Sequence, residues 1–350
     1  MPGELRQDSV VVTDPAEASA LHNRGWFGTA LPGGGLALTL LEAVYLAEVD
    51  RLVITRRERP VPMRELYRAA SATVDQFEIR YIVFRDLRQR GYVVEERPGP
   101  PDFQVFPRGG APKRTPSKYW VQALSERAVF DLDSLWTWMH AASAVRKSLL
   151  LAVVDEESDL TYYAVREAQP RGHGRPPSTE TPTVVHFLGD RAMVVDEAQA
   201  RAVHASGFFG KIVGRRLQLS LLETAYLLKA GRVQVRNADS DRPIGLPRLL
   251  KEARAAQPDF DLRLRVYEDL ASRGITAKTG FKYGSHFRAY EGDPEAHHSK
   301  YLVHALPKGY RGMWPEVSRG VRLAHGVRKA LLLGEVGEEV RYARLERVRP

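Results

Sequence analysis

The sequence contains an internal duplication, and this feature constrains the fold more than any other. Five blocks of the first half recur in the second half at offsets between 181 and 183 residues. The matched blocks are 25–28 with 207–210, 40–46 with 221–227, 86–91 with 269–274, 117–119 with 299–301, and 145–151 with 327–333. A nearly constant offset over five blocks indicates a tandem repeat, in which each copy folds into the same supersecondary arrangement.

A Gly- and Pro-rich stretch separates the two copies. Residues 169–182 have the composition of a linker. The sequence therefore predicts a first repeat at 1–168 and a second repeat that begins at 183. Within the second repeat we expect an N-terminal subdomain at 183–274 and a C-terminal module at 275–350.

The local patterns predict an α+β fold in each repeat. Ser220 and Glu223 form a capping-box pattern before an expected helix at 220–230, and Thr39 with Glu42 repeats it in the first copy. The expected elements of the C-terminal module are strands at 275–278, 287–290, 301–305, 331–335 and 340–345, and a helical segment from Pro315 to Leu333 that includes Lys329. Each repeat is thus a small N-terminal α/β subdomain followed by a mixed sheet with a packed helix.

Composition limits the possible partners. The 350 residues carry a net charge of +9, which favours a polyanionic partner. No apolar run approaches the roughly 18 residues of a membrane span, and the N-terminus lacks a signal-peptide pattern. The chain has no cysteine, which excludes disulfides and thiolate zinc sites. We therefore expect a soluble, cytoplasmic protein without a membrane partner.

The two copies share apolar positions but differ at polar ones. Tyr290 and His298 of the second copy are replaced in the first, whereas Lys329 is kept. The matches, with the second copy given first, are Tyr290 with Phe106, His298 with Pro116, Arg322 with His140, and Lys329 with Lys147. The first copy lacks both the phenol oxygen and the imidazole. This difference predicts a single working site, in the second repeat, and an inactive scaffold in the first.

The three retained residue types suit RNA cleavage without a metal. A phenolate can take the proton of a 2′-OH, an imidazolium can protonate the leaving 5′-oxygen, and an ammonium can balance the charge of the phosphorane. A metal-dependent nuclease usually needs clustered carboxylates, often with a lysine two residues after an acidic residue. No lysine of this chain has an acidic residue at that position. We therefore expect no metal and no cofactor.

Three runs in the second repeat carry a family resemblance. Residues 280–290, 298–303 and 322–329, which contain Tyr290, His298 and Lys329, resemble the archaeal tRNA-splicing endonucleases. The resemblance covers nearly the whole chain and is closest to the homodimeric type with a duplicated subunit. It implies cleavage of precursor tRNA at bulge–helix–bulge intron–exon junctions, with 2′,3′-cyclic phosphate and 5′-hydroxyl ends.

The resemblance also implies roles for single residues. Tyr290 matches the general base, His298 the general acid and Lys329 the transition-state stabiliser. Arg322 and Arg344 match two arginines that hold a bulge base, and Arg344 aligns with Tyr162 if no gap intervenes. The acidic residues Asp155, Glu156, Glu157 and Asp159 match a loop that joins the two subunits of the dimer.

Alternatives remain at the level of sequence. A shift of one residue would make His297 the acid instead of His298, and successive residues of a strand point to opposite faces. A non-catalytic RNA-binding or assembly subunit and a metal-dependent nuclease on a related fold are the competing functions.

Overall fold

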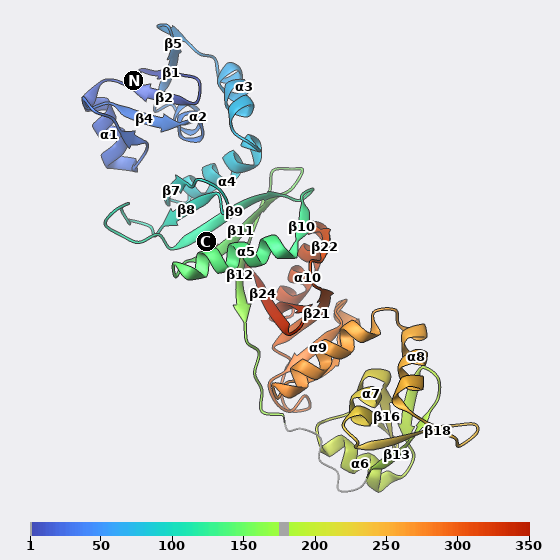
Figure 1. Cartoon of the computed structure of the whole chain (residues 1–350). Coiled ribbons are helices and arrows are strands. Elements are labelled where there is room, and N and C mark those ends of the chain that lie inside the picture. Colours follow the sequence, from blue (N-terminus) through green and yellow to red (C-terminus); the bar gives the residue numbers. More distant parts are fainter. Residues whose placement is uncertain (1, 175–181) are drawn as a thin grey trace. The chain divides into compact units, whose positions relative to one another are not determined.

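The computed structural model describes residues 2–174 and 182–350, and it divides into two compact units. The first unit comprises Met1–Val129, Ser134–Val165 and Val348–Pro350; the second comprises Phe130–Asp133 and Arg166–Arg347. Of the expected linker at 169–182, residues 175–181 lie outside the described part. Each unit contains one N-terminal and one C-terminal subdomain, so the duplicated α+β organisation is confirmed (Figure 1).

The two N-terminal subdomains have the same six-stranded topology. The strand orders are β3-β4-β2-β1-β5-β6 and β15-β16-β14-β13-β17-β18. The elements of the first copy are β1 (Pro2–Leu5), β2 (Ser9–Val12), α1 (Pro15–Gly25), β3 (Thr29–Ala30), β4 (Leu36–Thr39), α2 (Leu40–Glu48), β5 (Val53–Arg56), β6 (Arg59–Pro60) and α3 (Met63–Thr73). Those of the second are β13 (Thr183–Phe187), β14 (Arg191–Val194), α6 (Glu197–Ala205), β15 (Lys211–Val213), β16 (Arg216–Ser220), α7 (Leu221–Lys229), β17 (Val233–Asn237), β18 (Pro243–Ile244) and α8 (Leu246–Ala256).

Both predicted capping boxes are present and extend into the preceding loop. In α7 the Ser220 hydroxyl accepts the Glu223 N–H, and the Glu223 carboxylate accepts the Ser220 N–H. The same carboxylate also accepts the Gly210 N–H at 2.8 Å. Gly210 has a φ of +63°, and a Cβ there would lie 2.4 Å from the Gln218 carbonyl oxygen, so only glycine fits. Glu42, Thr39 and Gly28 repeat this arrangement in the first copy.

The C-terminal subdomain of the first repeat contains an α-helix, a mixed sheet and a second helix. Its strands follow the order β7-β8-β9-β11-β12. The elements are α4 (Phe77–Gln89), β7 (Val93–Glu96), β8 (Phe103–Phe106), β9 (Tyr119–Ser125), β10 (Val129–Asp131), α5 (Leu132–Ala144), β11 (Ser148–Val154) and β12 (Leu160–Ala168).

The corresponding subdomain of the second repeat has the order β19-β20-β21-β23-β24. Its elements are α9 (Phe260–Ser272), β19 (Thr276–Thr279), the 3-10 turn η1 (Phe281–Tyr283), β20 (Phe287–Tyr290), β21 (Tyr301–Pro307), β22 (Arg311–Met313), α10 (Trp314–Gly326), β23 (Ala330–Val336) and β24 (Val340–Val348). Helix α9 packs on β19, β21 and β23. Helix α10 covers the opposite face, where Gly320 faces the Leu331 side chain.

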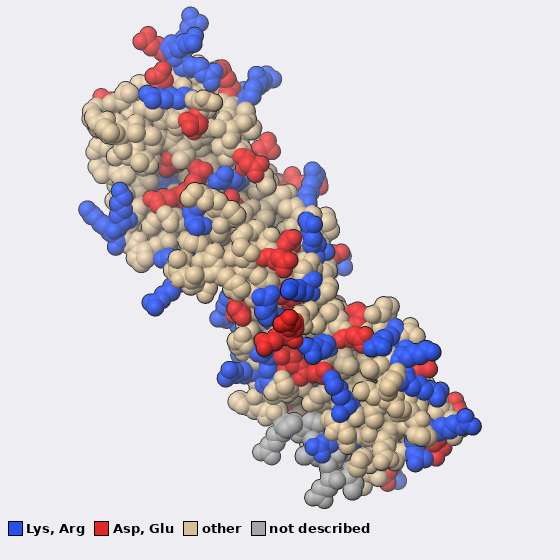
Figure 2. Space-filling model, in the orientation of Figure 1, with Lys and Arg blue, Asp and Glu red and all other residues tan. Residues whose placement is uncertain are grey.

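The core of this sheet lies under α9. It includes Val266 and Leu270 of the helix, and Phe287, Val303 and Leu332 of the strands. Alternate strand residues point to one face, which explains why apolar residues recur at every second position. No helix in the described ranges is long and apolar enough to span a membrane. On the face drawn in Figure 2, basic and acidic side chains are interspersed.

Candidate active site

Three neighbouring strands of the second repeat have adjacent ends: β20 ends where β21 and β23 begin. Ala289 of β20 pairs with Tyr301 of β21, and Tyr301 pairs with Ala330 of β23. Tyr290 and Lys329 are each one residue beyond these pairs, and the segment with His298 leads directly into β21. Since adjacent strands lie about 4.8 Å apart, the backbones of Tyr290 and Lys329 are separated by about 10 Å.

Tyr290 is the last residue of β20 and is largely enclosed, with 6% of its surface exposed. The guanidinium carbon of Arg288 lies 5.8 Å from the centre of its ring. Tyr290 also lines a hollow of about 890 Å³, together with Lys278, Arg288 and Glu295. The Tyr290 phenol therefore lies in a hollow that is also lined by basic side chains, and it is the candidate proton acceptor.

His298 lies in the exposed loop that joins β20 and β21. The Asp293 carbonyl accepts the His297 N–H at 3.0 Å, and its carboxylate accepts the Glu295 N–H at 2.7 Å. An ion pair of 2.7 Å between Glu291 and Lys300 closes the base of the loop. Both His297 and His298 are exposed to solvent, so either imidazole is accessible to a substrate.

Lys329 follows α10 rather than lying on it, which corrects the expected helix. The helix ends at Gly326, and Arg328 has a φ of +56° that turns the chain into β23. The Lys329 N–H donates to the Ala324 carbonyl at 2.8 Å, and its ammonium donates to the Val327 carbonyl at 3.3 Å. Arg322 and Lys329 therefore do not lie on one face of the same helix.

A basic hollow of about 580 Å³ surrounds Lys329. Its lining includes Lys300, His325, Arg328, Arg344 and the carboxylate of Glu346. The Arg344 guanidinium donates to Glu346 at 2.6 Å and lies 5.8 Å from the centre of the Tyr301 ring. Its Nε is buried and has no hydrogen-bond partner in the part of the chain that the structure describes. The Arg344 and Lys329 side chains therefore line the same hollow.

Arg322 is placed differently from Arg344. It is exposed on α10 and lies outside this hollow. The structure thus brings Arg344 to Lys329 and leaves Arg322 on the outer surface of the helix.

The first repeat preserves the backbone of this site but lacks two of its functional groups. Phe106 pairs with Val93 as Tyr290 pairs with Thr276. The N–H of Lys118 donates to Val105 as that of Lys300 donates to Ala289. Ser117 and Ser299, the residues that precede these lysines, are both buried. Pro116 therefore occupies the position of His298, as the sequence comparison indicates.

The match of Arg344 to Tyr162 is wrong. Tyr162 donates to Asp86 at 2.6 Å, and Tyr342 donates to Asp269 at 2.7 Å. Leu332 pairs with Arg344, whereas the equivalent Leu150 pairs with Ala164. The connection between β11 and β12, residues 155–159, is longer than residues 337–339 between β23 and β24, and this length difference shifts the alignment.

The acidic loop is an exposed turn in the first unit. The Asp155 carboxylate accepts the N–H groups of Glu157 and Asp159 at 3.0 and 2.8 Å, which fixes the turn. Glu156 forms an ion pair with Arg127. Glu157 and Asp159 are directed to solvent, so their charges are available to a partner.

A segment that the sequence suggested only as a linker contacts the end of α9 and the start of the loop that contains His298. The N–H groups of Gly172 and Gly174 donate to the carbonyls of Arg273 and Gly274, and the His173 N–H donates to the carbonyl of Glu291, directly after Tyr290. A Cβ on Gly172 would lie 2.2 Å from the Gly274 oxygen. The Gly-rich composition was the available signal, because backbones approach this closely only at glycine.

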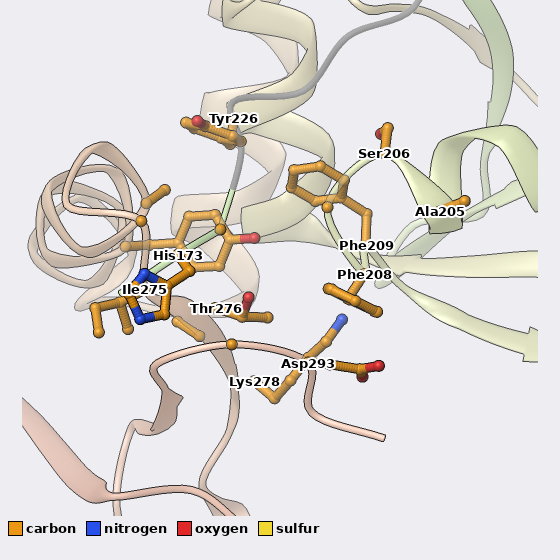
Figure 3. A pocket seen from close by; sticks show the side chains of 17 residues that line it. His173, Ala205, Ser206, Phe208, Phe209, Tyr226, Ile275, Thr276, Lys278 and Asp293 are labelled. Atoms are coloured by element: carbon orange, nitrogen blue, oxygen red, sulfur yellow. The ribbon is translucent and has the colours of Figure 1, made fainter. Parts of the chain in front are cut away.

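A hollow of about 370 Å³ lies beside this contact (Figure 3). Its lining includes His173, Phe208, Tyr226, Lys278 and Asp293. The Lys278 ammonium donates to the buried Glu223 carboxylate at 2.9 Å and to the Gly210 carbonyl at 3.1 Å. Burial raises the pKa of Glu223, but Lys278 and the N–H groups of Ser220 and Gly210 outweigh burial and leave this pKa below its ordinary value.

Comparisons with known proteins match both repeats. The family described as tRNA intron endonuclease, catalytic C-terminal domain, matches residues 77–162 and 260–342, and its N-terminal domain matches 1–67 and 185–250. The tRNA-splicing endonucleases of Methanococcoides burtonii and Methanosarcina acetivorans are 39% and 38% identical to this chain, over 95% and 100% of both chains. That of Haloferax volcanii is 31% identical over 100% of both.

The repeated subdomains and these matches define an endonuclease with a duplicated catalytic domain. The chain belongs to the tRNA intron endonuclease family. Among residues 2–174 and 182–350, no cluster of three or more His, Asp or Glu side chains could hold a metal ion.

Proposed function

We propose that this chain cleaves precursor tRNA at intron–exon junctions by a metal-independent transesterification at Tyr290, His298 and Lys329. The Tyr290 phenolate takes the proton of the 2′-OH, and the resulting oxygen attacks the adjacent phosphorus. The bond to the 5′-oxygen breaks as the His298 imidazolium donates its proton to that oxygen. The products are a 2′,3′-cyclic phosphate and a 5′-hydroxyl, and Lys329 stabilises the charge that develops on the phosphorane.

The observation that supports this proposal is that the end of β20 lies beside the starts of β21 and β23. The register places Tyr290 and Lys329 on either side of the entry to β21. The equivalent edge of the first repeat holds Phe106, Pro116 and Lys147, which include no proton acceptor or donor apart from the lysine. This difference supports a single catalytic site in each chain.

Arg344 and Arg322 of the same unit are proposed to bind the substrate. Arg344 lines the same hollow as Lys329 and is placed to hold an RNA group at the site. Arg322, exposed on α10, is proposed to hold a bulge base together with Arg344, which requires the RNA to extend over the helix. Stacking of an unpaired base on a guanidinium suits a splayed nucleotide of a bulge–helix–bulge motif.

The active form is proposed to be a homodimer in the cytoplasm. The acidic residues Asp155, Glu156, Glu157 and Asp159 would contact a basic surface of the second chain. The support is their exposure at a turn that the Asp155 side chain holds in a fixed conformation.

The deciding experiment is the end chemistry of a cleaved precursor. The purified chain is incubated with a bulge–helix–bulge precursor tRNA in excess chelator. We expect cleavage with a 2′,3′-cyclic phosphate and a 5′-hydroxyl. A 3′-hydroxyl product, or loss of cleavage with the fold intact, would favour a metal-dependent nuclease. Binding without cleavage under all metal conditions would favour the non-catalytic assembly subunit.

A further inference from the structure

The turn between β19 and β20 exposes an aromatic side chain that nothing in the fold requires. Phe281 is 87% exposed, whereas the other exposed large apolar side chains in the described part of the chain do not exceed 53%. Exposure of a large aromatic ring is unfavourable in water. A ring in this position is therefore available to a partner, and Tyr and Phe are common stacking platforms for unpaired bases.

The turn that carries Phe281 is held in one conformation. The Tyr283 N–H donates to the Gly280 carbonyl at 2.8 Å, and the Gly284 N–H donates to the Phe281 carbonyl at 3.0 Å. The buried Ser285 hydroxyl donates to the Phe287 carbonyl at 3.2 Å. Because these bonds fix the backbone on both sides of Phe281, the ring is presented to solvent by a preorganised turn, which lowers the entropic cost of binding.

The surroundings of Phe281 are basic. Lys282 is exposed, and neither Lys282 nor Arg288 forms an ion pair within residues 2–174 and 182–350. The Arg288 Nε donates to the Thr279 carbonyl at 2.9 Å, which holds the side chain along the hairpin. An exposed aromatic ring that is followed directly by a lysine without an ion pair fits a nucleic-acid strand, in which each base adjoins a phosphate.

Arg288 connects this turn to the candidate active site. Its guanidinium carbon lies 5.9 Å from the centre of the Tyr283 ring and 5.8 Å from that of Tyr290. From Phe287 to Tyr290, strand β20 spans about 10 Å, which is about three stacked nucleotides. An RNA strand with its scissile phosphate at Tyr290 therefore reaches the turn within a few nucleotides.

The equivalent turn of the first repeat is built differently. Residues 97–102 contain prolines and no aromatic residue, and Arg97 covers the Trp120 ring at 3.5 Å. The exposed ring is thus present only in the repeat that has Tyr290 and His298.

We propose that Phe281 and Lys282 form a stacking subsite for an unpaired nucleotide of the RNA substrate, a few nucleotides from the scissile phosphate. The Phe281 ring stacks on the base, and the Lys282 ammonium contacts a neighbouring phosphate. The subsite rests on the proposed function of Tyr290, His298 and Lys329, and it adds a specificity determinant outside the arginine pair.

The test measures single-turnover cleavage of a bulge–helix–bulge RNA over a range of enzyme concentrations. Phe281→Ala should raise the half-saturating concentration by about 5- to 150-fold, from a stacking contribution of about 1–3 kcal/mol per base. The rate at saturation should stay at the wild-type value. Phe281→Trp should bind the RNA about as well as wild type. Phe281→Leu should bind it as weakly as Phe281→Ala, because leucine has no ring to stack on a base. Val213→Ala, at a 53% exposed residue of β15, serves as the control.

Salt dependence tests the contribution of Lys282. Lys282→Ala should reduce the slope of the logarithm of the RNA association constant against the logarithm of salt concentration by about 0.7. This is the change expected for the loss of one phosphate contact to a single strand. An unchanged slope would remove Lys282 from the subsite.

The competing explanation is that Phe281 contacts a second protein chain, and the oligomeric state distinguishes this from an RNA subsite. If Phe281→Ala dissociates the oligomer in sedimentation and Phe281→Leu restores it, the ring contacts a protein and the RNA subsite is refuted. An unchanged half-saturating concentration refutes it as well. If the wild-type chain binds the RNA but does not cleave it, the proposed function fails, and the same Phe281 comparison is then made by direct binding of the RNA.

Discussion

Lys329 and Lys147 occupy the same backbone position in the two repeats. The N–H of each donates to an alanine carbonyl, that of Ala324 or Ala142, at 2.8 Å. Each follows an arginine in the left-handed region, with φ values of +56° and +57°. The two lysines therefore form a matched pair that differs in its surroundings and not in its local conformation.

Substitution of this pair separates catalysis from structure. Lys329→Ala should lower the single-turnover rate by about 10²–10³-fold, because the phosphorane loses a preorganised cation. Lys147→Ala should leave this rate at the wild-type value, since Phe106 and Pro116 offer no proton path beside it. Equal losses of rate in folded proteins of the same oligomeric state would mean that the first repeat takes part in the chemistry.

The neighbouring histidines provide a second matched pair. His298→Ala should slow the chemical step by about 10²–10⁴-fold, because the leaving 5′-oxygen loses its acid, with little change in RNA binding. His297→Ala should have a much smaller effect. Both side chains are exposed, so neither change should disturb the core. Single-turnover rates at saturating enzyme decide between them, and the reverse order would assign the acid to His297.

Much of the sheet could be predicted because its local signals agree. Strand β20 has the predicted bounds, and the capping boxes at Ser220 and Thr39 begin helices where the pattern indicates. Apolar residues at every second strand position and a capping pair three residues apart are local features, so a single sequence contains them.

The end of α10 and the position of Arg344 depended on features that the sequence does not display locally. The run from Val327 to Leu333 is apolar enough to continue a helix, and only the left-handed turn at Arg328 ends it. The extra length of the loop at 155–159 shifts β12 against β24, which an ungapped comparison misses. The contacts of Gly172 and Gly174 with the end of α9, and of His173 with Glu291, are long-range, and composition alone gives no partner for them.

The acidic loop can be tested without disturbing its turn. Replacing Glu156, Glu157 and Asp159 by Gln, Gln and Asn keeps Asp155, whose carboxylate orders the loop. We expect weaker dimerisation in sedimentation, with the largest difference from wild type at low salt, because salt screens exposed charges. Glu338→Gln with Glu339→Gln, in the equivalent turn of the second repeat, is the control. A fully active wild-type monomer would contradict the proposed dimer.

The last prediction concerns two buried carboxylates that cap equivalent helices. Lys278 pairs with Glu223 at 2.9 Å, but the equivalent position of the first repeat is Glu95, so Glu42 lacks this ammonium. Burial raises the pKa of Glu42 to about 7 from 4.5, although the N–H groups of Gly28 and Thr39 oppose the rise. The pKa of Glu223 instead lies below its ordinary value.

The contributions of Glu42 and Glu223 to the free energy of unfolding should change with pH in opposite directions. Between pH 4.5 and 7 the folded chain holds a proton on Glu42 that the unfolded chain has released, so the free energy of unfolding falls as pH rises. The full loss corresponds to about 3 kcal/mol. Glu223 contributes stability above its unfolded pKa, and this contribution is lost as pH falls through its lowered folded pKa.

Denaturant unfolding of wild type, Glu42→Gln and Glu223→Gln at pH 5, 6, 7 and 8 measures both effects. Burial also raises the pKa values of Glu96 and Asp102, so the contribution of Glu42 is taken from the difference between variant and wild type at each pH. Glu42→Gln should gain stability relative to wild type as pH rises from 5 to 8. Glu223→Gln should be destabilised throughout the range, because Lys278 loses its buried partner. A constant difference between Glu42→Gln and wild type over this range would show that Glu42 is ionised in the fold, with a cation near enough to replace Lys278.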